Sequence, residues 1–153
     1  MENEKNEEFL KARKIERGSV IDHITAGRAL KVLKVLGIDE RFKGTVTVLM
    51  NVPSTSYGSK DLIKIEGRQL DKAEAQKIAL LAPYATIVTV RDFQVIDKYR
   101  VSLPDVIEGV ARCPNPNCLS ASEGLSKFFT EERDPIKLRC AYCESVFGEA
   151  ELL

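Results

Sequence analysis

The sequence predicts an α+β fold: an N-terminal antiparallel sheet with two helices on one face, followed by a small all-β module. Two observations support this prediction. Segments with strand and helix patterns follow one another in the order β-α-β-β-α-β, with one further strand, over the first two thirds of the chain. All four cysteines of the 153-residue chain lie beyond these segments. We therefore expect two domains, at residues 1–103 and 104–153.

The first strand-helix-strand unit covers residues 19–52. Residues 19–24 (SVIDHI) are rich in β-branched side chains, which favours a strand. Residues 26–37 predict a helix that Gly37 ends, because they place four apolar side chains at helical spacing: Ala29, Leu30, Leu33 and Leu36. Residues 44–52 alternate with period two, which predicts a strand that carries on one face Val46, Val48, Met50 and Val52.

The second unit begins with residues 60–66, where Ile63 and Ile65 share one face of a predicted strand. Leu62 and Lys64 fall on the other face of that strand.

Residues 71–83 predict the second helix, because Asp71 is a good N-cap and Glu74 follows three residues later. Two strands follow, at residues 85–90 and 92–101. This order is that of the ferredoxin-like plan, in which two split βαβ units share one sheet and both helices cover one face. The opposite face is then left for a partner, a ligand or water.

The charge balance excludes several classes of protein. Basic and acidic side chains both number 23, so the net charge is zero, which argues against binding nucleic acid through bulk charge. No apolar run approaches the roughly 20 residues of a membrane span. The first residues, MENEKNEEF, are charged and unlike a secretory signal. We expect a cytoplasmic protein with reduced thiols.

The four cysteines form the pattern C-x4-C-x21-C-x2-C, which is typical of a tetrahedral thiolate site for zinc. Its ligands would be Cys113, Cys118, Cys140 and Cys143. Residues 104–153 are too few for a good core, so the metal would supply folding free energy, on the order of 10 kcal/mol. Four thiolates leave no position for a catalytic water, which makes the site structural. Iron, a disulfide framework and two reduced structural pairs are the alternatives.

The only histidine, His23, stands beside Asp22 and raises the question of catalysis. Adjacent residues on a strand point to opposite faces, so a direct relay between the two is not expected. No nucleophile elbow, phosphate-binding loop or zinc-protease motif occurs. His23 is therefore either a strand residue with one hydrogen bond or a ligand contact. Lys60 and Lys64 share a strand face with Leu62, where they are either solvated or able to hold a phosphate.

Five segments in this order and spacing resemble the regulatory chains of aspartate carbamoyltransferase, over about residues 10–150: RGSVIDHI, GSKDLIKIE, IALLAP followed by AT, CPNPNC and CAYCE. The resemblance implies a nucleotide-binding allosteric domain at 1–103 and a zinc domain at 104–153 that contacts the catalytic chain. It also implies no catalytic activity, one structural Zn²⁺ per chain, and CTP and ATP as effectors. Two catalytic trimers and three regulatory dimers would assemble, with each dimer formed through the allosteric domains.

The resemblance also implies the residues of the effector site. Asp22 and His23 would lie near ribose and phosphate, and Lys64 and Lys98 would contact ribose or triphosphate. The apolar and backbone positions around base and sugar would be Ile15, Val20, Val90 and Val95. Backbone groups near Lys14 and Ile15 would read the edge of the base, and Phe93 would also belong to the site. Two positions depart from the family pattern: Val88 stands where an asparagine is common, and Phe93 where a tyrosine is common.

Two rival functions are weaker. A zinc-ribbon protein that binds nucleic acid on its sheet would display aromatic side chains on the strands, and VTVLMNV and DLIKIE carry none. A metal-dependent hydrolase would need an open coordination position.

Overall fold

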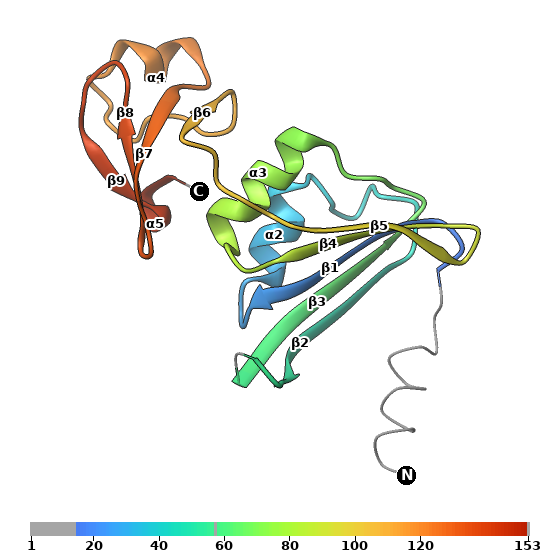
Figure 1. The fold of residues 1–153 in the computed structure, drawn as a ribbon. Helices are drawn as coiled ribbons and strands as arrows, with labels where there is room; N and C mark the ends of the chain where they lie inside the picture. The colour runs from blue at the N-terminus through green and yellow to red at the C-terminus, as the bar shows by residue number, and fades with distance from the viewer. Residues whose placement is uncertain (1–14, 57, 153) are drawn as a thin grey trace.

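The computed structural model describes residues 15–56 and 58–152, so the predicted site residue Lys14 lies outside the described residues. The chain forms two antiparallel sheets (Figure 1). The first has the order β2-β3-β1-β4-β5, with β1 (Gly18–Thr25), β2 (Val46–Ser54), β3 (Gly58–Glu66), β4 (Thr86–Arg91) and β5 (Gln94–Arg100). The second has the order β6-β7-β8-β9, with β6 (Val106–Glu108), β7 (Lys127–Arg133), β8 (Ile136–Cys140) and β9 (Val146–Gly148).

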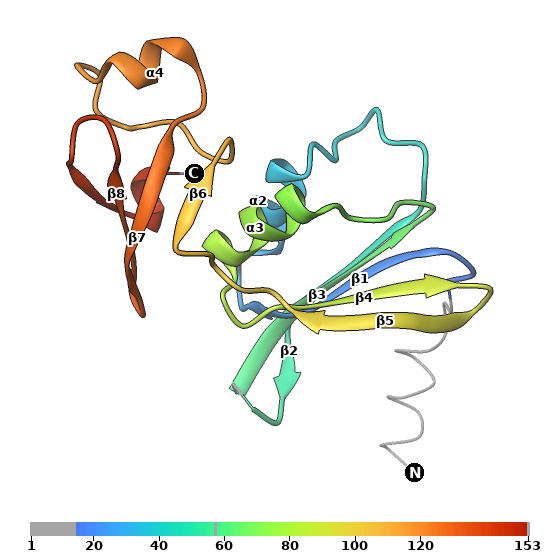
Figure 2. The ribbon, with the colours of Figure 1, turned by 45° about the horizontal axis from the view of Figure 1, so that its top comes forward.

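The N-terminal sheet has the topology that the sequence predicts. Strand β1 lies between β3 and β4 and is antiparallel to both, which is the arrangement of two split βαβ units. Helices α2 (Ala29–Val35) and α3 (Lys72–Leu81) cover the same face of this sheet (Figures 1 and 2). The α+β prediction is confirmed. The second sheet is accompanied by two short helices, α4 (Leu119–Glu123) and α5 (Glu149–Leu152).

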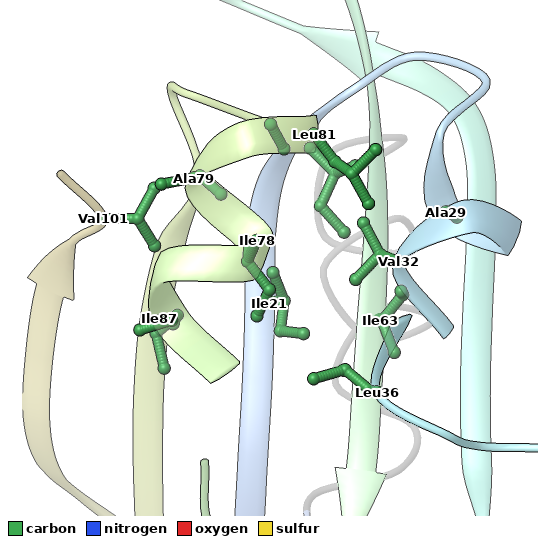
Figure 3. Packing of buried hydrophobic residues seen from close by; sticks show 14 of the residues in the cluster. Ile21, Ala29, Val32, Leu36, Ile63, Ile78, Ala79, Leu81, Ile87 and Val101 are labelled. Carbon is green, nitrogen blue, oxygen red and sulfur yellow. The ribbon is translucent and has the colours of Figure 1, made fainter. Parts of the chain in front are cut away.

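The main core lies between the sheet and its two helices (Figure 3). Ile21, Ile63 and Ile87 point from three neighbouring strands towards Ile78 of α3 and Val32 of α2, and all are buried. Burial of each such side chain contributes about 1.5–3 kcal/mol relative to exposure. The register of the sheet is therefore fixed, because a slip by one residue would turn these isoleucines to the opposite face.

The predicted apolar stripe of the first helix is wrong at one position. Leu30 is 62% exposed, whereas Val32 is fully buried. The helix begins at Ala29 rather than at residue 26, because a turn containing Gly27 (φ +90°) precedes it. The buried positions are then Ala29, Val32 and Leu36, spaced by three and four residues.

The capping box of α3 is confirmed. The Asp71 carboxylate accepts a 2.8 Å hydrogen bond from the Glu74 N–H, and the Glu74 carboxylate accepts one of 3.2 Å from the Asp71 N–H. The helix ends at Leu81, two residues before Pro83.

A buried carboxylate holds the turn before α2 against the sheet. Asp61 of β3 is fully buried, and one of its oxygens accepts hydrogen bonds from the N–H groups of Gly27 and Ala29, each 2.9 Å long. The other oxygen accepts a 2.8 Å bond from Asn51, where a bulge interrupts β2. The predicted alternation of β2 stops at this bulge, and Met50 is exposed.

The two halves of the molecule are in contact through α3 and α2. Leu80 of α3 is fully buried in the core of the C-terminal sheet. Arg28, which precedes α2, donates a 2.7 Å hydrogen bond to the carbonyl of Leu81 and pairs with Glu149 of α5. Within residues 15–56 and 58–152, no helix is long and apolar enough to cross a membrane.

Candidate functional site

Four thiols gather at one end of the C-terminal sheet. Cys113 and Cys118 lie in the segment between β6 and α4, Cys140 ends β8, and Cys143 lies in the turn before β9. Their sulfur atoms all lie within 4.8 Å of one another, and three of the four residues are buried. The Cys113–Cys143 and Cys118–Cys140 sulfur pairs are 3.7 and 3.9 Å apart. The structure therefore brings together the four cysteines that the sequence pattern predicts to form one cluster.

These separations match a four-thiolate metal site. A tetrahedral centre with metal–sulfur bonds of about 2.3 Å separates its sulfurs by about 3.8 Å. Among the thiols alone, burial raises the pKa of Cys113 to about 12, whereas hydrogen bonds from Ser145 lower the pKa of Cys143 to about 6. A cation at the centre would favour the ionised form of all four. The cluster thus supports a structural metal.

The face of the N-terminal sheet opposite the helices gathers most of the predicted nucleotide contacts. Strand pairing places Lys64, Val20, Val88 and Lys98 in one row across four strands. Directly paired residues point to the same side of a sheet, so all four side chains lie on this face. The two lysines flank the two valines, and the backbones of the lysines are about 14 Å apart because three strand spacings separate them. Val90 and Val95 form the next pair on the same face.

A bulge in β1 overturns the expectation that Asp22 and His23 point to opposite faces. The register shifts between Ile21 and Ile24, both of which are buried under the helices. Because strand neighbours alternate, Asp22 next to Ile21 and His23 next to Ile24 both lie on the open face. His23 has a φ of +56°, and its backbone N–H donates a 2.6 Å hydrogen bond to the Asp22 carboxylate. Its ring Nδ1 lies 3.3 Å from the hydroxyl of Thr86, the β4 partner of Asp22.

Charges of both signs meet at this end of the face. Asp22 pairs with Lys60 at 2.8 Å. Burial lowers the pKa of Lys64, and the negative charge of Asp22 acts in the opposite direction. A hollow of about 250 Å³ lies beside them, lined by His23, Ile24, Thr25, Ala26, Ser59 and Tyr84. Sequence reasoning had identified Lys60 as a neighbour of Lys64, but it had no signal for Thr86.

The apolar positions lie at the other end of β1. Ile15 is buried, and the Phe93 N–H donates a 3.0 Å hydrogen bond to the carbonyl of Glu16. The prediction that Phe93 belongs to a strand is wrong. Asp92 and Phe93 both have positive φ and form the turn between β4 and β5. Phe93 is 61% exposed. The open face thus runs from apolar side chains at the β4–β5 turn to charged ones at the β1 bulge.

Comparison with known proteins gives one consistent result. The family model described as aspartate carbamoyltransferase regulatory chain, allosteric domain, matches residues 10–102, and the corresponding metal binding domain matches residues 105–153. The regulatory chain of Thermofilum pendens is 53% identical over 150 residues, covering 96% of this chain and 94% of its own length. Those of Methanothrix thermoacetophila (52% over 145 residues, 94% of each chain) and Thermococcus kodakarensis (48% over 146 residues, 95% and 96%) are similarly related.

Proposed function

The chain belongs to the family of aspartate carbamoyltransferase regulatory chains, and from this premise we propose that it binds nucleotide effectors on the open face of its N-terminal sheet. The chains it resembles are regulatory and not catalytic, so no catalytic residue is assigned. The family match does not support the alternative of a zinc-ribbon protein that binds nucleic acid.

The main support for the proposal is that the open face of the sheet changes from apolar at the β4–β5 turn to charged at the β1 bulge. A nucleoside triphosphate has a planar base with apolar ring faces at one end and about four negative charges at the other. An apolar surface for the base and sugar is provided by Val20, Val90 and Val95, together with Ile15 before β1 and Phe93 at the β4–β5 turn. Lys60 and Lys64 provide positive charge near Asp22, and His23 lies beside them as a hydrogen-bonding group. Lys98 lies in the same row across the strands as Lys64. CTP and ATP are the effectors we propose.

We further propose zinc as the metal, one ion per chain. Sulfur separations of 3.7 and 3.9 Å support a zinc–thiolate tetrahedron, and the buried cluster leaves no position for a reacting water. Cys113, Cys118, Cys140 and Cys143 would hold the ion. Zinc supplies no redox chemistry, so its contribution is to the folding of the C-terminal module. Thiols of this kind persist in a reducing compartment, which supports a cytoplasmic location.

We propose that residues 104–153 contact the catalytic chain and that residues 1–103 pair with a second regulatory chain. Large apolar side chains project from the C-terminal part, with Leu119 80%, Tyr142 64% and Leu125 59% exposed, which favours a protein partner. Strand β5 is exposed along its whole length and carries Ile96 and Tyr99, which favours pairing of the N-terminal sheets. The assembly would contain two catalytic trimers and three regulatory dimers.

The effect of nucleotide binding would be transmitted through the contact between the N-terminal and C-terminal halves. Asp61 lies on β3 between Lys60 and Lys64 and binds the N–H groups on either side of Arg28. Arg28 in turn pairs with Glu149 beside the C-terminal sheet. An effector acts only through different affinities for two states of the assembly, so the two states would differ at this contact.

Calorimetric titration of the assembled complex with CTP and ATP tests the nucleotide site. We expect Lys64→Ala and His23→Ala to assemble normally but to bind both nucleotides at least tenfold more weakly, because each removes one contact to a charged group. Lys72→Ala, at the exposed start of α3 on the other side of the sheet, is the control and should match the parent chain. Parent-level affinity in both site variants would overturn the proposal.

A further inference from the structure

We propose that Ser120 and Ser126 are positioning residues of the metal centre, which join the backbone of one cysteine ligand to the sulfur of another. This inference rests on the proposed metal binding. Both serines are almost fully buried, 5% and 1% exposed, although serine is usually found at the surface. They lie on either side of the loop that follows α4, between the two cysteine pairs.

The contacts form a continuous chain. The Cys113 N–H donates a 3.1 Å hydrogen bond to the Ser126 hydroxyl. The hydroxyls of Ser126 and Ser120 are 2.8 Å apart. The Ser120 hydroxyl lies 2.9 Å from the sulfur of Cys118 and 3.9 Å from that of Cys140. Four groups, from two ligands and two serines, are thus linked in series.

The direction of this chain is fixed at both ends. A backbone N–H only donates, so Ser126 accepts from Cys113 and has its own proton left to give. A thiolate ligand only accepts, so Ser120 must donate to Cys118. Ser126 then donates to Ser120, and every hydroxyl in the chain has one donor and one acceptor. Hydrogen bonds in such a series polarise and strengthen one another.

Backbone amides contact both cysteine pairs, but the linked pair of buried serines belongs to the C-x4-C pair. In the C-x2-C pair, the backbone amides of Tyr142 and Glu144 reach the sulfur and the carbonyl of Cys140, at 3.4 and 2.9 Å. In the wider C-x4-C pair, backbone N–H groups of Asn115 and Ser120 reach the sulfurs of Cys113 and Cys118, and the two serine hydroxyls add the connection between these ligands. The Ser126 N–H also donates a 2.8 Å hydrogen bond to the Ala111 carbonyl, which holds this segment in place. Partners that orient a metal ligand typically change metal affinity 10- to 100-fold when they are removed.

Competition for zinc with a chromophoric chelator tests this inference on the full-length chain. We expect Ser120→Ala and Ser126→Ala to bind zinc about 10- to 100-fold more weakly than the parent. Ser120→Thr keeps the hydroxyl and should restore most of the affinity. Ser122→Ala is the matched control, since this exposed serine lies on the same helix and its hydroxyl donates a hydrogen bond to the Leu119 carbonyl.

Cobalt substitution adds a readout that a purely structural role would not move. Loss of a hydrogen bond to the Cys118 sulfur should shift the sulfur-to-cobalt charge-transfer absorption in Ser120→Ala but not in Ser122→Ala. If the parent chain binds no zinc, the proposed metal is wrong and this inference falls with it. If the parent binds zinc and Ser120→Ala matches Ser122→Ala in affinity and spectrum, only the serine inference is overturned. If Ser126→Ala does not fold, Ser120→Ala and Ser120→Thr decide the question.

Discussion

The two halves of this chain are stabilised by different means. The N-terminal sheet buries a cluster of fifteen apolar residues beneath two helices. The C-terminal sheet buries ten, of which three are cysteines and one, Leu80, is contributed by α3 of the other half. An apolar core of the first kind is sufficient for a small domain, whereas the second needs a metal ion and a neighbour. The difference predicts which half fails first under each perturbation.

Metal removal should have the largest effect and should act on one half only. Chelation, or Cys113→Ser, removes folding free energy on the order of 10 kcal/mol. We expect residues 110–153 to become sensitive to protease and to lose amide protection, while the N-terminal sheet keeps both. Cys140→Ser should likewise abolish association with the catalytic chain. Unchanged circular dichroism and protease resistance after chelation, or normal assembly of the variant on sizing, would show that the C-terminal half does not depend on the metal.

Leu80→Ala should produce the next largest effect, and it should act across the boundary. Truncation of a fully buried leucine costs about 2–5 kcal/mol, and the cavity would open in the C-terminal core although the residue belongs to α3. Hydrogen exchange should therefore show the greater loss of protection in residues 105–150. Leu30→Ala, on the exposed side of α2, is the control and should change stability little. Loss of protection confined to the N-terminal sheet would show that each half is self-contained.

Arg28→Met should have the smallest effect, about 1 kcal/mol or less, because the Arg28–Glu149 pair is about 30% exposed and screened by water. We expect the two halves to unfold at more widely separated denaturant concentrations, and the difference from the parent to shrink in high salt. Arg41→Met removes an exposed pair with Asp39, two residues away, and serves as the control. An equal shift in both variants would mean that Arg28 does not couple the halves.

The order of the elements in the N-terminal half could be predicted because it depends on local patterns. The alternation of Ile63 and Ile65, the capping box of Asp71 and Glu74, and the turn after Leu81 each arise within a few residues. The cysteine cluster could be predicted for a similar reason, since two close pairs and one connecting loop restrict how four thiols meet. The exposure of Leu30 was missed because Ala29 and Leu30 are neighbours about 100° apart around the helix axis, and only packing against the sheet decides which of the two is buried.

The sequence by itself determined the strand and helix order of the N-terminal half, its apolar faces and the grouping of the four cysteines, because periodicity and spacing are properties of neighbouring residues. Only the tertiary structure decided that Asp22 and His23 share a face, since a bulge depends on how β1 pairs with β3. It also decided that Lys64 and Lys98 stand in one row, that Ser120 reaches Cys118 through a buried chain, and that Leu80 fills the core of the other half. Each of these contacts depends on the register and packing of segments that approach one another only in the folded chain.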